Sequence, residues 1–454
     1  MASVIASYVV TPKEETPKGL FCLTDSDQIN PWSHVSTIYV YKNKNNVNVN
    51  ELVQRMRDSL SHILVHYYPL SGRLNWTEVG RLQMDCNAKG VILIQAESKK
   101  TMDEYGDFSP NDDAIKELIP NLDYSQPMED LPLLLAQVTK FHGDGNAIAI
   151  AISISHTMGD AVSSVHFINS WAKLTRGDSL DQNELPFLDR TVFTTSRLPA
   201  VRHFDHPEFN PPPVILGRTN NIEEQKKETR FAFFKLTAEQ VDKLKQRANT
   251  GYSDESKQRA YSRFEAIGAH IWRCACMARE LDKNQPTLVK TAVDVRNKVN
   301  PPLPKNYFGN GLVTTVTTTC CVGDMISEPV SYGAKRIREA VQRVANDEYI
   351  RSHLEFVARQ ETMDMLRTQS VEECRADVSF SRDPNIVLGS WLQLPFYEAD
   401  FGWGKPHHFG PGIVPPIDIG IMAPTPDADG SIVIFMNFQI AHMQNFVKHF
   451  WDNL

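Results

Sequence analysis

The sequence feature that most constrains the fold is a regular run that ends in a histidine. From 146 to 155, small or polar side chains alternate with isoleucine, and H-T-M-G-D follows at 156 to 160. Successive side chains of a strand point to opposite faces, so the isoleucines would line one surface of a sheet and the small residues the other. His156 then stands at the end of this strand. Apolar residues at helical spacing over 162 to 171 predict a helix directly afterwards.

A strand, a short turn and a helix can deliver a side chain from a rigid element into a crevice. His156 could act there as a general base, because the reference pKa of histidine is about 6.5. A histidine in a turn can equally bond a backbone carbonyl, and Asp160 can cap the following helix. The spacing alone favours this second interpretation, because such pairs arise often by chance.

Composition excludes several classes of protein. The chain has 454 residues, of which 41% are hydrophobic and 22% charged, and a formal net charge of −8. This balance suits a soluble globular protein of two large domains. There is no run of five or more lysines and arginines, so no nucleic-acid partner is expected. The seven cysteines show no disulfide or zinc spacing, and no metal site is predicted.

The N-terminus lacks the basic region of a signal peptide, and no apolar run is long enough to cross a membrane. We therefore expect a cytoplasmic protein without a membrane partner. The proline-rich segment 185–224 predicts an extended crossover between an N-terminal domain, 1–184, and a C-terminal domain, 225–454. Periodicity predicts strands at 34–42, 131–141, 146–155, 312–322 and 431–440, and helices at 50–66, 237–247, 263–279 and 331–347.

A second motif, D-F-G-W-G at 400–404, gives His156 more weight. Together with H-T-M-G-D it resembles the BAHD family of plant acyl-CoA-dependent acyltransferases. Further matching segments follow the family's order: Y-P-L-S-G-R-L at 68–74, V-D-V-R at 293–296, P-P-L-P at 301–304 and Y-F-G-N at 307–310. The resemblance covers essentially the whole chain. One departure is Ala161, where many family members have glycine.

The resemblance implies an α/β fold of two chloramphenicol-acetyltransferase-like domains. Each would hold a mixed sheet flanked by helices, with a solvent channel between the domains and His156 midway along it. Acyl-CoA would enter from one face as co-substrate, and the acceptor from the other. No permanently bound cofactor and no acyl-enzyme intermediate are implied, and the family expectation is a monomer.

The same resemblance implies roles for individual residues. His156 would take a proton from the acceptor and return it to the thiolate, while the indole of Trp391 would stabilise the oxyanion. Asp160 would pair with Arg296 and hold the loop. Asp400, Gly402 and Gly404 would form a structural turn, and Lys257, Ser262 and Arg263 would contact CoA.

Among BAHD branches, the chain looks most similar to plant spermidine hydroxycinnamoyl transferases. The segments that carry this similarity are 64–69, 94–98, 107–110, 135–141, 204–206 and 272–276. It implies transfer of a hydroxycinnamoyl group from its CoA thioester to an amine of spermidine, a polyamine, with formation of hydroxycinnamoyl spermidine amides. Polyamine ammonium groups need carboxylates and aromatic faces. Candidate acceptor contacts are Thr37, Tyr39, Glu398 and Asp27, with Asp25 as an alternative to Asp27.

Two alternatives remain open. The same fold could acylate the hydroxyl of shikimate or quinate, and Arg375 or Arg382 could then grip the acceptor carboxylate. The chain could also be a non-catalytic relative that binds small molecules or partners. The presence of both His156 and Trp391 argues against that last possibility.

Overall fold

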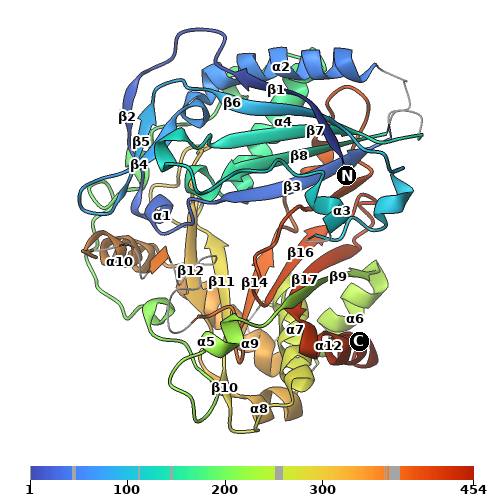
Figure 1. Ribbon diagram of the computed structural model, residues 1–454. Helices are drawn as coiled ribbons and strands as arrows, with labels where there is room; N and C mark the ends of the chain where they lie inside the picture. The colour runs from blue at the N-terminus through green and yellow to red at the C-terminus, as the bar shows by residue number, and fades with distance from the viewer. Residues whose placement is uncertain are drawn as a thin grey trace.

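Two six-stranded sheets, stacked end to end in Figure 1, form the framework of the protein. The structure is a computed structural model that describes residues 2–42, 48–110, 113–143, 147–250, 259–361, 363, 366–367 and 379–454. Strands and helices mix in both halves, which confirms the predicted α/β class.

The first sheet has the strand order β1-β6-β7-β8-β3-β15. Only β6 and β7 run parallel; the other neighbours are antiparallel. Its strands are β1 (Ser3–Val10), β3 (His34–Tyr41), β6 (Val91–Glu97), β7 (Leu134–Lys140), β8 (Ile148–Ser155) and β15 (His408–Pro411). A small sheet of β2 (Gly19–Phe21), β5 (Leu82–Cys86) and β4 (Arg73–Trp76) lies beside it.

The predicted alternation along β8 is present and buries both faces of the strand. The isoleucines belong to the main core together with α2 (Val49–His66) and α4 (Ala161–Thr175). Ala149 and Ala151 face a smaller core, built around Tyr105, Phe108 and Phe141 and including α3 (Asp113–Lys116). Small side chains on this face let that layer approach the sheet closely. The strand is therefore fixed on both sides, which gives His156 a rigid base.

The sixth strand of the first sheet comes from the far end of the chain. β15 pairs antiparallel with β3, so that Phe409 lies opposite Tyr39 and Pro411 opposite Thr37. The aromatic ring of Phe409 packs 5.1 Å from that of Tyr39. The main core consequently includes Phe231, Phe409 and Phe435 from the second half of the chain. One continuous hydrophobic cluster thus joins the two halves.

The second sheet has the order β12-β11-β14-β16-β17-β9. Helices α7, α9 and α12 pack against it and form a second core (Figure 1). Its strands are β9 (Thr229–Leu236), β11 (Val289–Asp294), β12 (Leu312–Val316), β14 (Ile386–Ser390), β16 (Ile419–Pro424) and β17 (Ile432–Gln439), and β10 (Pro286–Thr287) pairs separately with β13 (Cys320–Cys321). The helices are α6 (Ala238–Ala248), α7 (Arg263–Arg279), α8 (Val322–Ser327), α9 (Val330–Arg343), α10 (Asp347–Ala358) and α12 (Ile440–Asp452).

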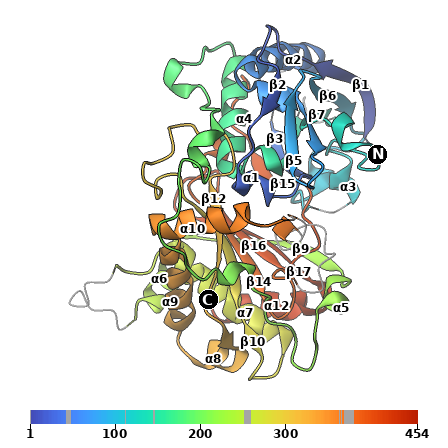
Figure 2. The same cartoon turned by 90° about the vertical axis from the view of Figure 1, so that its left-hand side faces the viewer.

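The proline-rich segment runs between the sheets through short turns: η6 (Arg190–Phe193), η7 (Pro207–Phe209) and α5 (Ile222–Gln225). Helix α10 contacts α1 (Asp25–Gln28), and Figure 2 shows α10 beside the junction of the two sheets. Within the described chain, no helix combines the length and apolar character that crossing a membrane requires.

Candidate active site

His156 begins a one-turn helix, η4 (His156–Met158), directly after β8. Its backbone N–H donates to Ser33 O at 3.0 Å, and its carbonyl accepts from Asn310 Nδ2 at 2.9 Å. The ring is half-buried, and its Nδ1, which solvent does not reach, has no hydrogen-bond partner within the described chain. The backbone is therefore held from both halves of the chain.

Asp160 caps α4 and pairs with Arg296, as the resemblance implied. Its carboxylate accepts from Arg296 Nη1 and Nη2 at 2.8 and 2.9 Å, from Ser163 N at 3.0 Å and from Gly311 N at 2.9 Å. Only 2% of Asp160 and 9% of Arg296 are exposed. Burial by itself would lower the pKa of Arg296, but the neighbouring carboxylates raise it above its ordinary value. Because Asp160 is turned into this ion pair, it holds the loop.

A second buried ion pair supports the same loop. Arg190, in η6, pairs with Asp27 at 2.9 Å, and both side chains are inaccessible to solvent. Arg190 also donates to the carbonyls of Thr157 and Met158 at 3.4 and 2.5 Å. Asn310 donates from Nδ2 to Asp27 at 2.9 Å and to Thr157 O at 3.2 Å. The carbonyls next to His156 are therefore fixed by charged and amide donors.

This pair corrects the prediction that Asp27 contacts the acceptor. Its oxygens accept from Arg190, Asn310 and Thr24, and none of its surface reaches solvent. The alternative, Asp25, pairs with Arg81 at 3.2 Å. The sequence reasoning missed Arg190 and assigned no role to Asn310. A charged residue in the proline-rich segment was the available signal, but its partner is 163 positions away.

Trp391 directly follows β14, and its backbone N–H donates to Met422 O at 2.7 Å. Its half-buried ring packs 5.4 Å from Phe396 and 6.1 Å from Phe435. No acceptor for the indole N–H occurs among the residues that the structure describes. This N–H is therefore a donor available to a ligand.

The D-F-G-W-G turn packs on the first sheet. Asp400 Oδ1 accepts from Gly402 N and Gly404 N at 2.8 and 2.9 Å, and both glycines adopt positive φ angles of 109° and 105°. Such angles favour glycine because it lacks a Cβ. Phe401 and Trp403 stack at 5.7 Å, and Phe401 meets Trp171 of α4 edge-on at 5.2 Å. These contacts give the turn a structural function.

The other candidate contacts for the acceptor differ in how far they are buried. Tyr39 is fully buried, which raises the pKa of its hydroxyl far above the usual value, while Thr37 is half-buried on the same strand. Glu398 lies on the surface, where it pairs with Lys405 at 2.6 Å. The carboxylate is therefore accessible, and its contact with the acceptor stays a prediction.

The CoA candidates lie at the start of α7. Ser262 caps the helix by accepting from Glu265 N at 3.3 Å, and Arg263 is exposed at the first helical position. Lys257 lies outside the described residues. Two arginines were candidates for gripping an acceptor carboxylate. Arg382 is fully buried and donates to Gln225 O at 2.9 Å, whereas Arg375 lies outside the described residues.

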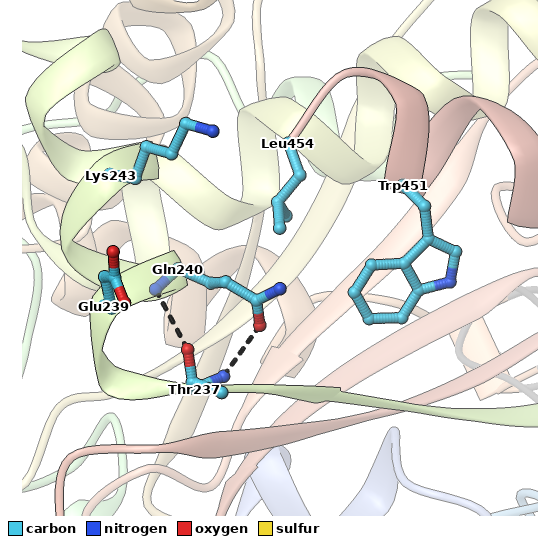
Figure 3. A pocket seen from close by; sticks show the side chains of 6 residues that line it. All are labelled: Thr237, Glu239, Gln240, Lys243, Trp451 and Leu454. Atoms are coloured by element: carbon cyan, nitrogen blue, oxygen red, sulfur yellow. Dashed lines mark hydrogen bonds between the residues drawn. The ribbon is translucent and has the colours of Figure 1, made fainter.

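Two surface hollows lie away from the predicted site residues. The larger has a volume of about 380 Å³ and lies between α6 and the end of α12. Figure 3 shows Thr237 and Gln240 exchanging hydrogen bonds there, as a capping box does. Its lining holds none of the predicted site residues. The channel past His156 stays a prediction.

The family comparisons cover the whole chain. A family model described as the Transferase family matches residues 1–453. The chain is 37% identical, over all of both chains, to hydroxycinnamoyl-CoA:piscidic acid hydroxycinnamoyltransferase of Actaea racemosa. It is 35% identical to shikimate O-hydroxycinnamoyltransferase of Nicotiana tabacum, over 98% of each chain. It is 34% identical to hydroxycinnamoyl-CoA:5-hydroxyanthranilate N-hydroxycinnamoyltransferase of Avena sativa, over 99% of each.

Solved structures support the fold. Vinorine synthase matches with a TM-score of 0.72 at 21% identity, over 98% of this chain and 96% of that one. TRI101 of F. graminearum, complexed with coenzyme A and T-2 mycotoxin, matches with a TM-score of 0.76 at 17% identity, over 94% and 96%. At these identities the likeness bears on the fold alone, and it agrees with the predicted two-domain acyltransferase architecture.

Proposed function

The chain belongs to the BAHD family of acyltransferases, which use acyl-CoA as co-substrate, and from this premise we propose that His156 is the general base of a hydroxycinnamoyl transfer. The imidazole takes the proton of the acceptor N–H or O–H as the acceptor attacks the thioester carbonyl. The tetrahedral intermediate then expels the CoA thiolate, which receives that proton from the imidazolium. One C–S bond breaks and one C–N or C–O bond forms, so no further reactant is required.

The observation that carries this proposal is the partly accessible ring of His156 at the rigid end of β8. Replacing His156 by alanine should lower kcat by about 10²–10⁴-fold, the usual contribution of a general base. Binding of CoA and the thermal midpoint should stay near their original values, because the loop is held through its backbone. His62→Ala, a change at an exposed histidine of α2, is the control. Unchanged turnover in His156→Ala would refute the assignment.

Trp391 is proposed as the oxyanion donor because its indole N–H has no acceptor within the described chain. Trp391→Phe keeps an aromatic ring but removes that donor. We expect kcat to fall by about 10²–10³-fold, with a smaller change in KM, as for the loss of a single donor of this kind. Trp403→Phe is the matched control, since Trp403 is buried in the turn. Equal effects of the two substitutions would contradict a specific role for Trp391.

For the acceptor we propose an amine of spermidine. The support is the similarity of the six segments to plant spermidine hydroxycinnamoyl transferases, together with one relative that is named as an N-acyltransferase. Asp27 is buried in its ion pair with Arg190, so Glu398, which is exposed beside Lys405, is the proposed anionic contact. Thr37, which is half-buried, remains the proposed contact on β3, whereas Tyr39 is fully buried in the main core. The attacking amine must be neutral. CoA is proposed to meet Lys257, Ser262 and Arg263.

A second candidate is O-acylation of a hydroxy acid, which the names of the piscidic acid and shikimate relatives favour. One hydroxycinnamoyl-CoA should be offered with spermidine, shikimate and piscidic acid in parallel, followed by product mass and thiol release. Spermidine amides as the main product support the first candidate, and esters support the second. Binding of CoA without thiol release for any acceptor would instead point to a non-catalytic relative.

A further inference from the structure

Three buried side chains converge where the proline-rich segment meets α10. His206 and Glu208 lie at η7, and His353 lies on α10. Glu208 Oε1 is 3.0 Å from His206 Nδ1 and 2.9 Å from His353 Nδ1. One ligand atom from each side chain can be chosen so that all three lie within 4.8 Å of one another. The three residues are only 7%, 1% and 1% exposed.

Glu208 differs from the other buried carboxylates of the described chain. Six other Asp or Glu residues are at most 3% exposed, and each forms an ion pair with arginine or lysine. These pairs are Asp27 with Arg190, Asp160 with Arg296, Glu224 with Arg218 and Lys227, Glu265 with Arg259 and Arg338, and Asp383 and Asp418 with Arg279. Glu208 forms ion pairs with two histidines, and the buried Lys290 also interacts with it electrostatically. A buried carboxylate needs a compensating positive charge, which a protonated side chain or a metal cation can supply.

The surrounding contacts orient these groups as outer partners orient metal ligands. The Tyr349 hydroxyl donates to the carboxylate of Glu208, 2.7 Å from Oε2 and 3.0 Å from Oε1, and Oε1 also faces both imidazoles. Ser352 Oγ lies 2.9 Å from His206 Nε2, so the opposite nitrogen, Nδ1, faces the carboxylate. Hydrogen bonds of this kind fix ring orientation and ligand basicity in metal sites.

The spacing also fits a small divalent cation. Zinc bonds nitrogen and oxygen at about 2.0–2.2 Å, so neighbouring ligands of a tetrahedral ion lie roughly 3.3 Å apart. The observed separations from Glu208 Oε1 need to open by only a few tenths of an ångström. The two imidazole rings lie 5.6 Å apart, and both direct Nδ1 toward the same oxygen of Glu208.

We propose that His206 Nδ1, Glu208 Oε1 and His353 Nδ1 bind a divalent transition metal, with Zn²⁺ preferred for two imidazoles and one carboxylate. The ion would tie the proline-rich segment to α10. Because α10 contacts α1, and α1 contacts the turn of His156, the site would brace the junction of the two sheets. This inference is independent of the acyl acceptor and of the proposed chemistry at His156.

The test uses the full chain and cobalt as a spectroscopic probe. After chelator treatment and desalting, Co²⁺ should bind at one ion per chain, give visible d–d absorption and raise the thermal midpoint. Elemental analysis of untreated protein should find close to one equivalent of zinc. Glu208→Gln should abolish the absorption, and Tyr349→Phe should weaken Co²⁺ binding by about 10–100-fold through loss of the outer hydrogen bond.

His203→Ala is the matched control, because His203 lies in the same segment but its side chain is 60% exposed. It should bind Co²⁺ like the original chain. If Glu208→Gln fails to fold, the measurements on the unaltered chain still decide. Absence of stoichiometric metal, of d–d absorption and of a midpoint shift in the unaltered chain overturns the proposal, and a protonated histidine or Lys290 then compensates Glu208.

Discussion

The loop of His156 and the D-F-G-W-G turn both join the two halves of the molecule, but through different forces. Around the loop, two ion pairs link residues far apart in the chain: Asp27 with Arg190 and Asp160 with Arg296. The turn instead packs Phe401 and its neighbouring rings against α4, β3 and one another. The loop depends on charge compensation, whereas the turn depends on shape.

This difference predicts how each region fails. Removal of one partner from a buried ion pair leaves an uncompensated charge, which costs more than the pair itself contributes. Aromatic packing loses stability in proportion to the volume removed. The loop should therefore respond to single substitutions sharply and recover when both charges are removed. The turn should respond gradually.

The largest expected effect is that of Arg190→Met. Asp27 would remain buried without a cation, so the free energy of unfolding should fall by about 3–5 kcal/mol. Adding Asp27→Leu should restore part of that loss, because the stranded charge disappears. Urea unfolding of the two single variants and the double variant gives the coupling energy. If the double variant lost more free energy of unfolding than the two single variants together, the role of charge compensation at this loop would be contradicted.

Acidification should destabilise β15, the strand that follows the turn. Burial, with a smaller contribution from His407, lowers the pKa of His408 in β15 to about 4. An unfolded histidine titrates near 6.5, so the stabilisation is present above that pH and is lost as the pH falls toward 4. We expect a loss of about 2 kcal/mol at pH 5. His408→Gln should show a flatter dependence of the thermal midpoint between pH 7 and 5, and equal slopes would contradict the assignment.

The smallest effect expected is that of Phe401→Leu. Leucine keeps most of the buried volume beside Trp171, so the free energy of unfolding should fall by about 1 kcal/mol. The kcat should remain within about twofold, because the turn makes no contact with His156 in the described structure. Calorimetry and steady-state kinetics check the two values. A loss as large as that of Arg190→Met would show that shape and charge are equally critical here.

Local elements were predictable because their signals lie within the elements themselves. The alternation before His156 placed a strand at 146–155, and the structure has Ile148–Ser155. The apolar spacing at 263–279 matches α7 at both ends. The strand predicted at 312–322 is shorter, because β12 ends at Val316 and Cys320–Cys321 pairs with β10 instead. The sequence keeps its strand propensity beyond Val316, but the residues that follow pair with a different strand.

Long-range partners explain most of what the sequence could not predict. Asp27 looked like a ligand for an ammonium group because its cation, Arg190, is remote in the chain. For Glu398, the sequence alone could not show that the carboxylate is exposed and pairs with Lys405. The pairing of β15 with β3 likewise depends on contacts across more than 360 positions. Motif resemblance supplied Asp160 and Arg296, which periodicity could not have joined.

The pairing of β15 with β3 also affects the order in which a nascent chain can fold. During synthesis, β3 remains an open edge until residues 408–411 have left the ribosome. An uncovered edge offers unpaired backbone groups to other chains. The first half should therefore need protection until β15 has emerged, and a fragment that stops before β15 should aggregate during expression.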